Sequence, residues 1–283
     1  MLTLVPVLAL ASGCLPGDSR PEPGSVHVTA AASAAAVDGL QTEDGWTIGF
    51  ERFLAALGAI ELMGDACTGY AEPRYTRLFD FAQPMDGPQK VALVYGLGDC
   101  HLGYELSPPE DDALLGSGAT GADLEQMRVE QDDAWIDEPE RSSVHVQGSA
   151  SRDGVTKRFE WVFRMEYDVE KCEPGPDGGG SALDIDGGEA LEMTIVVDPA
   201  ELFRDGPDLD APLRFDALAA SDADGDDRIT LEELDEVAAP VSTDAETDPD
   251  SRESLANLLY DTLVPRVARP AGSGECEVEL DRR

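Results

Sequence analysis

Positive charge is what this sequence has least of. Among its 283 residues only three are lysines, Lys90, Lys157 and Lys171, and 20 basic residues stand against 59 acidic ones, for a formal net charge of −39. A surface this negative repels phosphate groups, which excludes nucleic acid as a partner and excludes electrostatic contact with anionic lipid headgroups. It attracts divalent cations and basic partners. High acidity also keeps a protein soluble and suits a saline habitat, so the charge alone assigns no function.

Aromatic residues are scarce as well, at 6%, although the hydrophobic content of 42% is ordinary for a globular chain. A chain of this length can bury a core in each of one or two domains, so its folding does not depend on metal or disulfides. The apolar run at the start, Leu2 to Ala11, is far shorter than the roughly 20 residues that a membrane-spanning helix needs. Such a short run is typical of an export signal.

The residues after this run resemble the lipobox of bacterial lipoproteins. Ala11, Ser12 and Gly13 are small and directly precede Cys14, and the resemblance implies that Cys14 is diacylated and becomes the first mature residue. Leu15 to Ser25 is rich in Pro and Gly, which fits a flexible tether. Residues 1–25 are therefore predicted to be a lipoprotein signal peptide and tether, which places the protein in the bacterial cell envelope with a lipid anchor as its only membrane contact. An ordinary signal peptide cut nearby, or a start codon assigned too far downstream, is the alternative explanation.

Four further cysteines are candidates for disulfides: Cys67, Cys100, Cys172 and Cys276. An even number in an exported chain indicates two bonds, and the sequence leaves all three connectivities open. No two of these cysteines have the short spacing that a tetrahedral zinc site needs.

Residues 26–204 have the pattern of strands and turns. From Arg158 to Tyr167 aromatic and apolar side chains alternate with charged ones, which is typical of a strand buried on one face, and the preceding Asp153-Gly154 turn predicts a hairpin with residues 143–147. Residues 48–62 fit a helix or a strand, and the Asp44-Gly45 turn signal before them favours the strand. We expect a mainly β chain with a β-sandwich-like domain here, because no helix-length pattern separates the strands.

Residues 205–283 change in character and favour helix. Pro212 limits the first helix to about two turns, a second is predicted from Thr230 to Ala238, and a third from Ser254 to Val264, ended by Pro265. Residues 243–251 read as an acidic linker. We therefore expect a small C-terminal helical appendage.

The segment Asp222 to Glu233 places oxygen-bearing side chains at alternate positions, which lets a turning backbone aim them at one hard cation. It resembles the twelve-residue calcium loop of the EF-hand family. The resemblance implies Ca²⁺ as cofactor, with the Arg228 carbonyl, Thr230 directly or through water, and a bidentate Glu233 among the ligands. The complete predicted ligand set is Asp222, Asp224, Asp226, Arg228, Thr230 and Glu233.

One departure from the family pattern lies inside the loop, because Asp227 occupies the position that usually needs the positive φ of glycine. Asp adopts that conformation at a cost of about 1 kcal/mol, which predicts weaker calcium binding than glycine at this position would give. A second loop is missing: Asp244, Glu246, Asp248 and Asp250 alternate, but no glutamate falls at the closing position and Pro249 breaks the run. The site is therefore predicted to be solitary. The alternative is an acidic turn without metal.

No catalytic pattern stands out. His27, His101 and His145 are scattered, and Cys100 and His101 are neighbours on a strand, where their side chains point to opposite faces. Beyond the calcium loop the chain resembles uncharacterised acidic bacterial lipoproteins with one terminal EF-hand, which assigns no role. We expect a non-enzymatic, calcium-binding module of the cell envelope with an unknown protein partner. The alternative is an envelope enzyme or metal-delivery protein with an unrecognised site in the β-domain.

Overall fold

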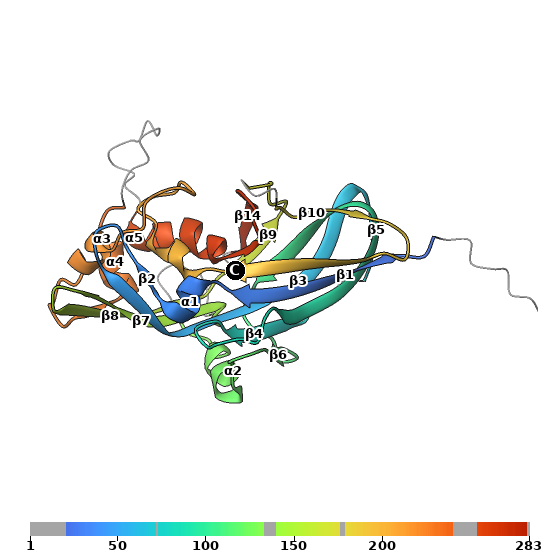
Figure 1. Cartoon of the computed structure of the whole chain (residues 1–283). Coiled ribbons are helices and arrows are strands. Elements are labelled where there is room, and N and C mark those ends of the chain that lie inside the picture. Colours follow the sequence, from blue (N-terminus) through green and yellow to red (C-terminus); the bar gives the residue numbers. More distant parts are fainter. Residues whose placement is uncertain (1–20, 72, 133–139, 176–178, 240–253, 282–283) are drawn as a thin grey trace, which may run out of the picture.

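The computed structural model describes residues 21–71, 73–132, 140–175, 179–239 and 254–281 (Figure 1). Cys14 and the acidic linker at 243–251 lie outside these residues. The strands are β1 (Gly24–Ala32), β2 (Leu40–Gln41), β3 (Thr47–Ala71), β4 (Thr76–Asp80), β5 (Gln89–Leu106), β6 (Leu114–Leu115), β7 (Val144–Arg152), β8 (Val155–Phe163), β9 (Glu166–Glu170), β10 (Ala182–Ile185), β11 (Ala190–Val197), β12 (Arg228–Ile229), β13 (Ala268–Pro270) and β14 (Glu277–Asp281). The helices are α1 (Ala34–Asp38), α2 (Gly121–Met127), η1 (Pro199–Phe203), α3 (Asp216–Ala220), α4 (Leu231–Asp235), α5 (Leu255–Leu258), η2 (Leu259–Leu263) and η3 (Val264–Val267).

The strands form one large mixed sheet, which confirms the prediction of a mainly β chain. The central path of this 14-stranded sheet runs β12-β8-β7-β3-β5-β1-β11-β13, with the remaining strands paired to its members. A sandwich would need two separate sheets, whereas the described strands belong to one hydrogen-bonded network. The long strands β3 and β5 account for this difference, because each pairs with several partners along its length.

The hairpin expected around the Asp153-Gly154 turn is present. β7 and β8 pair antiparallel in register from Val144 opposite Phe163 to Arg152 opposite Val155. Phe159, Trp161 and Phe163 on β8 are buried, as the alternation predicts. The strand expected to reach Tyr167 ends at Phe163, however, and Tyr167 belongs to the separate strand β9. The exposed turn has a positive φ at both Asp153 and Gly154.

Residues 48–62 are strand, as favoured, but the strand continues to Ala71. β3 bends as it runs, because its pairing with β5 shifts register between Gly58 and Glu61 and again between Met63 and Ala66. Ala59 and Gly64 have positive φ values at these irregularities, which is typical of β-bulges.

The C-terminal region is only partly helical. Its helices are short, and it also contributes β12, β13 and β14 to the sheet. The apolar side chains of these helices, such as Leu234 and Tyr260, belong to the same buried cluster as those of the strands. Pro265 does not end the last helix: it lies in the first turn of η3, where its missing N–H is not needed. Figure 1 shows α3, α4 and α5 on one side of the sheet and α2 on the other.

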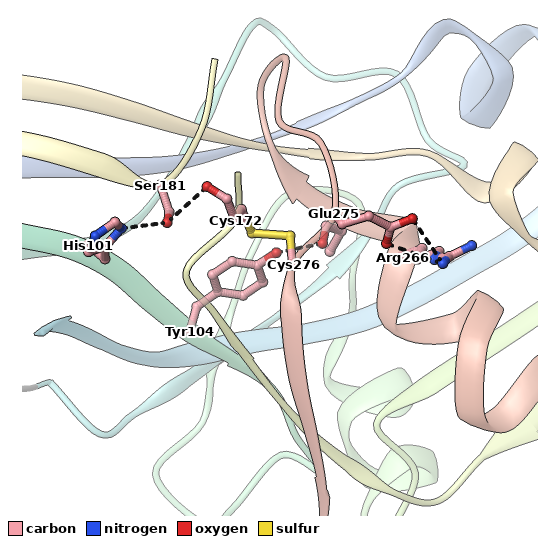
Figure 2. The surroundings of a disulfide bond; sticks show 8 residues. His101, Tyr104, Cys172, Ser181, Arg266, Glu275 and Cys276 are labelled. Atoms are coloured by element: carbon pink, nitrogen blue, oxygen red, sulfur yellow. Dashed lines mark hydrogen bonds and ion pairs between the residues drawn. A yellow bond between two sulfur atoms is a disulfide. The ribbon is translucent and has the colours of Figure 1, made fainter. Parts of the chain in front are cut away.

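Both predicted disulfides are present, and their pairing is now defined. Cys67 bonds Cys100 across β3 and β5, and Cys172 bonds Cys276, 104 residues later in the chain. Figure 2 shows the second bond beside Tyr104, whose hydroxyl donates to the Ala268 carbonyl. Two disulfides indicate an oxidising environment of the kind found outside the cytoplasm.

Candidate metal centre

The predicted calcium loop lies between α3 and α4, and its end is held by a capping box. The Thr230 hydroxyl accepts a hydrogen bond from the Glu233 amide at 3.2 Å. Glu233 Oε2 in return accepts from the Thr230 amide at 3.0 Å and from its hydroxyl at 3.1 Å. This reciprocal pair starts α4 at Leu231, as the Thr-x-x-Glu spacing predicts.

The three aspartates of the loop converge. Each offers a carboxylate oxygen, and these oxygens lie within 4.8 Å of one another at Asp222, Asp224 and Asp226. Backbone amides hold them in place: Asp222 Oδ1 accepts from Gly225 at 2.9 Å, and Asp226 Oδ1 accepts from Arg228 at 2.7 Å. The structure therefore brings together three of the predicted ligands.

Glu233 approaches the same loop from its far end. Its Oε1 accepts from the Ala223 amide at 3.2 Å, one residue after Asp222. The other oxygen is engaged in the capping box, so Glu233 is beside the three aspartates but does not belong to their cluster. Arg228 sends its side chain out of the loop toward Glu160 at 3.7 Å, which leaves only its carbonyl as a ligand candidate.

Asp227 has the conformation that its position requires. Its φ is 66°, in the left-handed region that favours glycine. Its carbonyl accepts from the Arg158 amide on β8 at 2.8 Å, so the sheet helps to hold this residue in place.

The sheet packs directly against the predicted calcium loop. β12 pairs in parallel with β8, with Arg228 opposite Arg158 and Ile229 opposite Phe159. Ile229 is 1% exposed, and its carbonyl accepts from Trp161 Nε1 at 2.9 Å. The loop is therefore attached to the β7–β8 hairpin by backbone and side-chain contacts.

Lys157 is a residue of the site that the sequence did not reveal. Its ammonium contacts Asp222 Oδ2 and lies 2.9 Å from Asp227 Oδ1. The Asp222 side chain is fully shielded from solvent. The hydrogen bond from Lys157 holds the pKa of Asp222 below its ordinary value, and those to Asp222 and Asp227 raise the pKa of Lys157. An internal cation thus neutralises part of the loop.

A second group of acids comes together on β5 and β9, and the sequence did not single it out either. Glu105, Glu166 and Asp168 offer oxygens within 4.8 Å of one another. Burial raises the pKa of Glu105, and the negative charges of Glu166 and Asp168, and more weakly Glu61, raise it further, to about 7. A hydrogen bond with the Ser107 hydroxyl acts in the opposite direction. The alternation of these three acids with apolar residues is visible in the sequence, but the pairing of β5 with β9 is not.

This shift predicts a pH-dependent stability. The pKa of Glu105 is about 7 in the folded protein, against an ordinary 4.5 that applies to the unfolded chain. The folded state is therefore most stable with respect to this group below pH 4.5, where Glu105 is protonated in both states, and this stability is lost as the pH rises through 7. In chelator at pH 8, Glu105→Gln should raise the free energy of unfolding by about 1–2 kcal/mol, after allowance for solvent screening of a partly exposed group. Urea unfolding at pH 4 and pH 8 checks this, and an equal effect at both values would contradict it.

In the part of the chain that the structure describes, no helix is long and apolar enough to cross a membrane. No protein-family model, curated protein or solved structure matches the chain.

Proposed function

We propose that the loop Asp222–Glu233 binds one calcium ion and that this protein is an exported, non-enzymatic binding or structural module of the cell envelope. The convergence of the Asp222, Asp224 and Asp226 carboxylates carries the proposal. Carboxylate oxygens are the ligands that calcium prefers. Glu233, the Arg228 carbonyl and Thr230 would complete the set.

The expected affinity is modest. The loop has no paired partner loop and holds a non-glycine residue at positive φ, so we expect a dissociation constant on the order of 0.1–1 mM, the range of extracellular calcium modules. Calcium at about ten times this constant would add roughly 1.4 kcal/mol to the stability of the folded state. Such a site suits structural ordering better than buffering.

The contacts to β8 indicate what calcium would order. Ile229 and Asp227 connect the loop to the strand through backbone hydrogen bonds, so a bound ion would fix the helical region against the β7–β8 hairpin. A thermal unfolding experiment tests the proposal: 10 mM CaCl₂ should raise the unfolding temperature above that in equal MgCl₂. Identical curves in both salts would sink it.

Lys157 is expected to compete with calcium, because both cations need Asp222. Lys157→Met should therefore tighten calcium binding about fivefold, by removing the competing ammonium and its repulsion of the ion. Calorimetric titration in about 0.1 M salt measures the effect.

Lys171→Met is the matched control, because it removes the same charge. Its ammonium pairs with Glu277 at 3.0 Å and contacts none of the loop acids. An affinity that changes equally in both variants would show that Lys157 acts only through net charge.

Export and lipid anchoring at Cys14 are part of the proposal. The two disulfides support an oxidising compartment. Cys14→Ser is expected to move the protein from the membrane fraction to the soluble fraction of the cell envelope, as followed by fractionation and immunoblotting. A wild-type protein already in the soluble fraction would contradict a lipid anchor.

A further inference from the structure

The helix that leads into the calcium loop, α3, is held at its start by a turn of the sheet. The residue at its N-cap position is Phe215, whose side chain has no oxygen to accept a hydrogen bond. Asp44, in the turn between β2 and β3, takes this role. Its Oδ2 accepts from the Phe215 amide at 2.8 Å and from the Asp216 amide at 2.8 Å. The helix is therefore capped by a residue 171 positions before Phe215 in the chain.

The turn that carries Asp44 is fixed by its own hydrogen bonds. The Thr42 amide donates to the Trp46 carbonyl at 2.9 Å, and the Thr42 hydroxyl accepts from the Trp46 amide at 3.0 Å. Gly45 has a φ of 90°, which glycine adopts without strain. Thr42 and Trp46 are both buried. Asp44 is thus presented to α3 by an ordered part of the sheet.

A second set of contacts holds the same helix from β7. Arg152, the last residue of that strand, lies 2.7 Å from Asp216 Oδ1 and donates to the Asp44 carbonyl at 2.7 Å. Its guanidinium carbon is 4.6 Å from the centre of the Trp46 ring. Trp46 Nε1 donates to the same Asp216 oxygen at 2.9 Å, and its ring centroid lies 5.1 Å from that of the buried Phe215. Polar and apolar contacts therefore fix the start of α3 together.

The other end of α3 leads directly to the first predicted ligand. Its C-cap is Ser221, whose hydroxyl donates to the Leu218 carbonyl at 2.8 Å, and Asp222 is the next residue. The Asp222 side chain is shielded from solvent and accepts from the amides of Gly225 and Asp227. A helix of five residues is not stable by itself. The position of Asp222 therefore depends on the contacts that hold α3.

We propose that the turn at residues 42–46, together with Arg152, positions Asp222 for calcium by holding α3 in place. This inference rests on the proposed calcium loop, and none of these positioning residues is a predicted ligand. Without the cap, calcium would have to order α3 as it binds, and the cost of that ordering would weaken the affinity. Because coupling between two sites is reciprocal, calcium in the loop stabilises the contact of α3 with this turn by the same factor.

Calorimetric titration of the chelator-treated full chain with CaCl₂ tests the role of the cap. Asp44→Ala removes the acceptor oxygen and should weaken calcium binding about fivefold, the effect of losing one helix cap. Asp44→Asn removes the charge but keeps an oxygen that can accept from the helix, so its affinity should stay within twofold of wild type. Thr120→Ala is the matched control, because Thr120 caps α2 on the other side of the sheet (Figure 1). It should lower the stability and leave the calcium affinity unchanged.

Urea unfolding in chelator, run on the same variants, separates positioning from stability. An Asp44→Ala protein that is less stable but binds calcium with wild-type affinity would overturn the positioning role and leave the calcium loop intact. Equal weakening in Asp44→Ala and Asp44→Asn would show that Asp44 acts through its charge, and would overturn the role of the cap. A wild-type protein that takes up no calcium would overturn the loop itself.

Hydrogen exchange of the wild-type protein tests the same coupling without any variant. Calcium at saturation should slow amide exchange about fivefold at residues 42–46 as well as in the loop, because the turn and the ion stabilise the same helix. Exchange in α2 should not change. Protection by calcium that is confined to residues 222–233 would contradict the coupling.

Discussion

Removing the Cys172–Cys276 disulfide is expected to lower the free energy of unfolding by about 3–5 kcal/mol. The bond closes a loop of 104 residues. Closing a loop of about 100 residues lowers the entropy of the unfolded chain, which raises its free energy by roughly 4.7 kcal/mol at 25 °C. It also ties the start of β14 to the end of β9, its neighbour in the sheet, with which β14 pairs from Glu277 opposite Glu170 onward. Cys172 is buried beside Tyr104 (Figure 2).

Urea unfolding of Cys172→Ser/Cys276→Ser under non-oxidising conditions measures the effect. Cys67→Ser/Cys100→Ser is the comparison, because its bond closes only 33 residues and should cost about 1 kcal/mol less. Reduced wild type should resemble a variant without either bond. Four free thiols in native protein, or unfolding midpoints that do not change, would contradict this account.

Glu233→Gln is expected to weaken calcium binding by more than tenfold while leaving the apo fold nearly unchanged. The substitution removes one negative charge from the predicted bidentate ligand, and charged ligands set the affinity of such loops. The amide oxygen of glutamine can still accept the hydrogen bond from Thr230 N, since capping boxes accept Glu or Gln. We therefore expect the stability in chelator to change by less than about 0.5 kcal/mol.

The adjacent Glu232 is the matched control, because it is exposed and carries the same charge. Glu232→Gln should change the calcium affinity less than twofold. Calorimetric titration of the three proteins separates the cases. Equal affinities for wild type and Glu233→Gln would mean that the loop is an acidic turn rather than a metal site.

Local patterns predicted the local structure well. The alternation on β8 defined a strand with one buried face, and Thr230 with Glu233 formed the capping box that their spacing predicts. The positive φ of Asp227 followed from its place in the loop. Each of these features depends on residues within a few positions of one another.

Long-range pairing was beyond the sequence. Lys157 and Asp222 are 65 residues apart and meet only because β12 pairs with β8. The cysteine pairing and the acidic group on β5 and β9 depend in the same way on which strands lie side by side. The single sheet depends on β3 and β5 each pairing with several strands along their length. The positive φ at Ala59, in one of the irregular stretches of β3, could not be expected from an alanine.

The most direct test of the calcium loop is a crystal structure of the protein grown in about 10 mM CaCl₂, with anomalous data collected at long wavelength. We predict an anomalous peak about 2.3–2.6 Å from oxygens of Asp222, Asp224, Asp226 and Glu233 and from the Arg228 carbonyl, with the Lys157 ammonium no longer in contact with Asp222. A loop without a peak, in which Lys157 still contacts Asp222, would contradict the proposal.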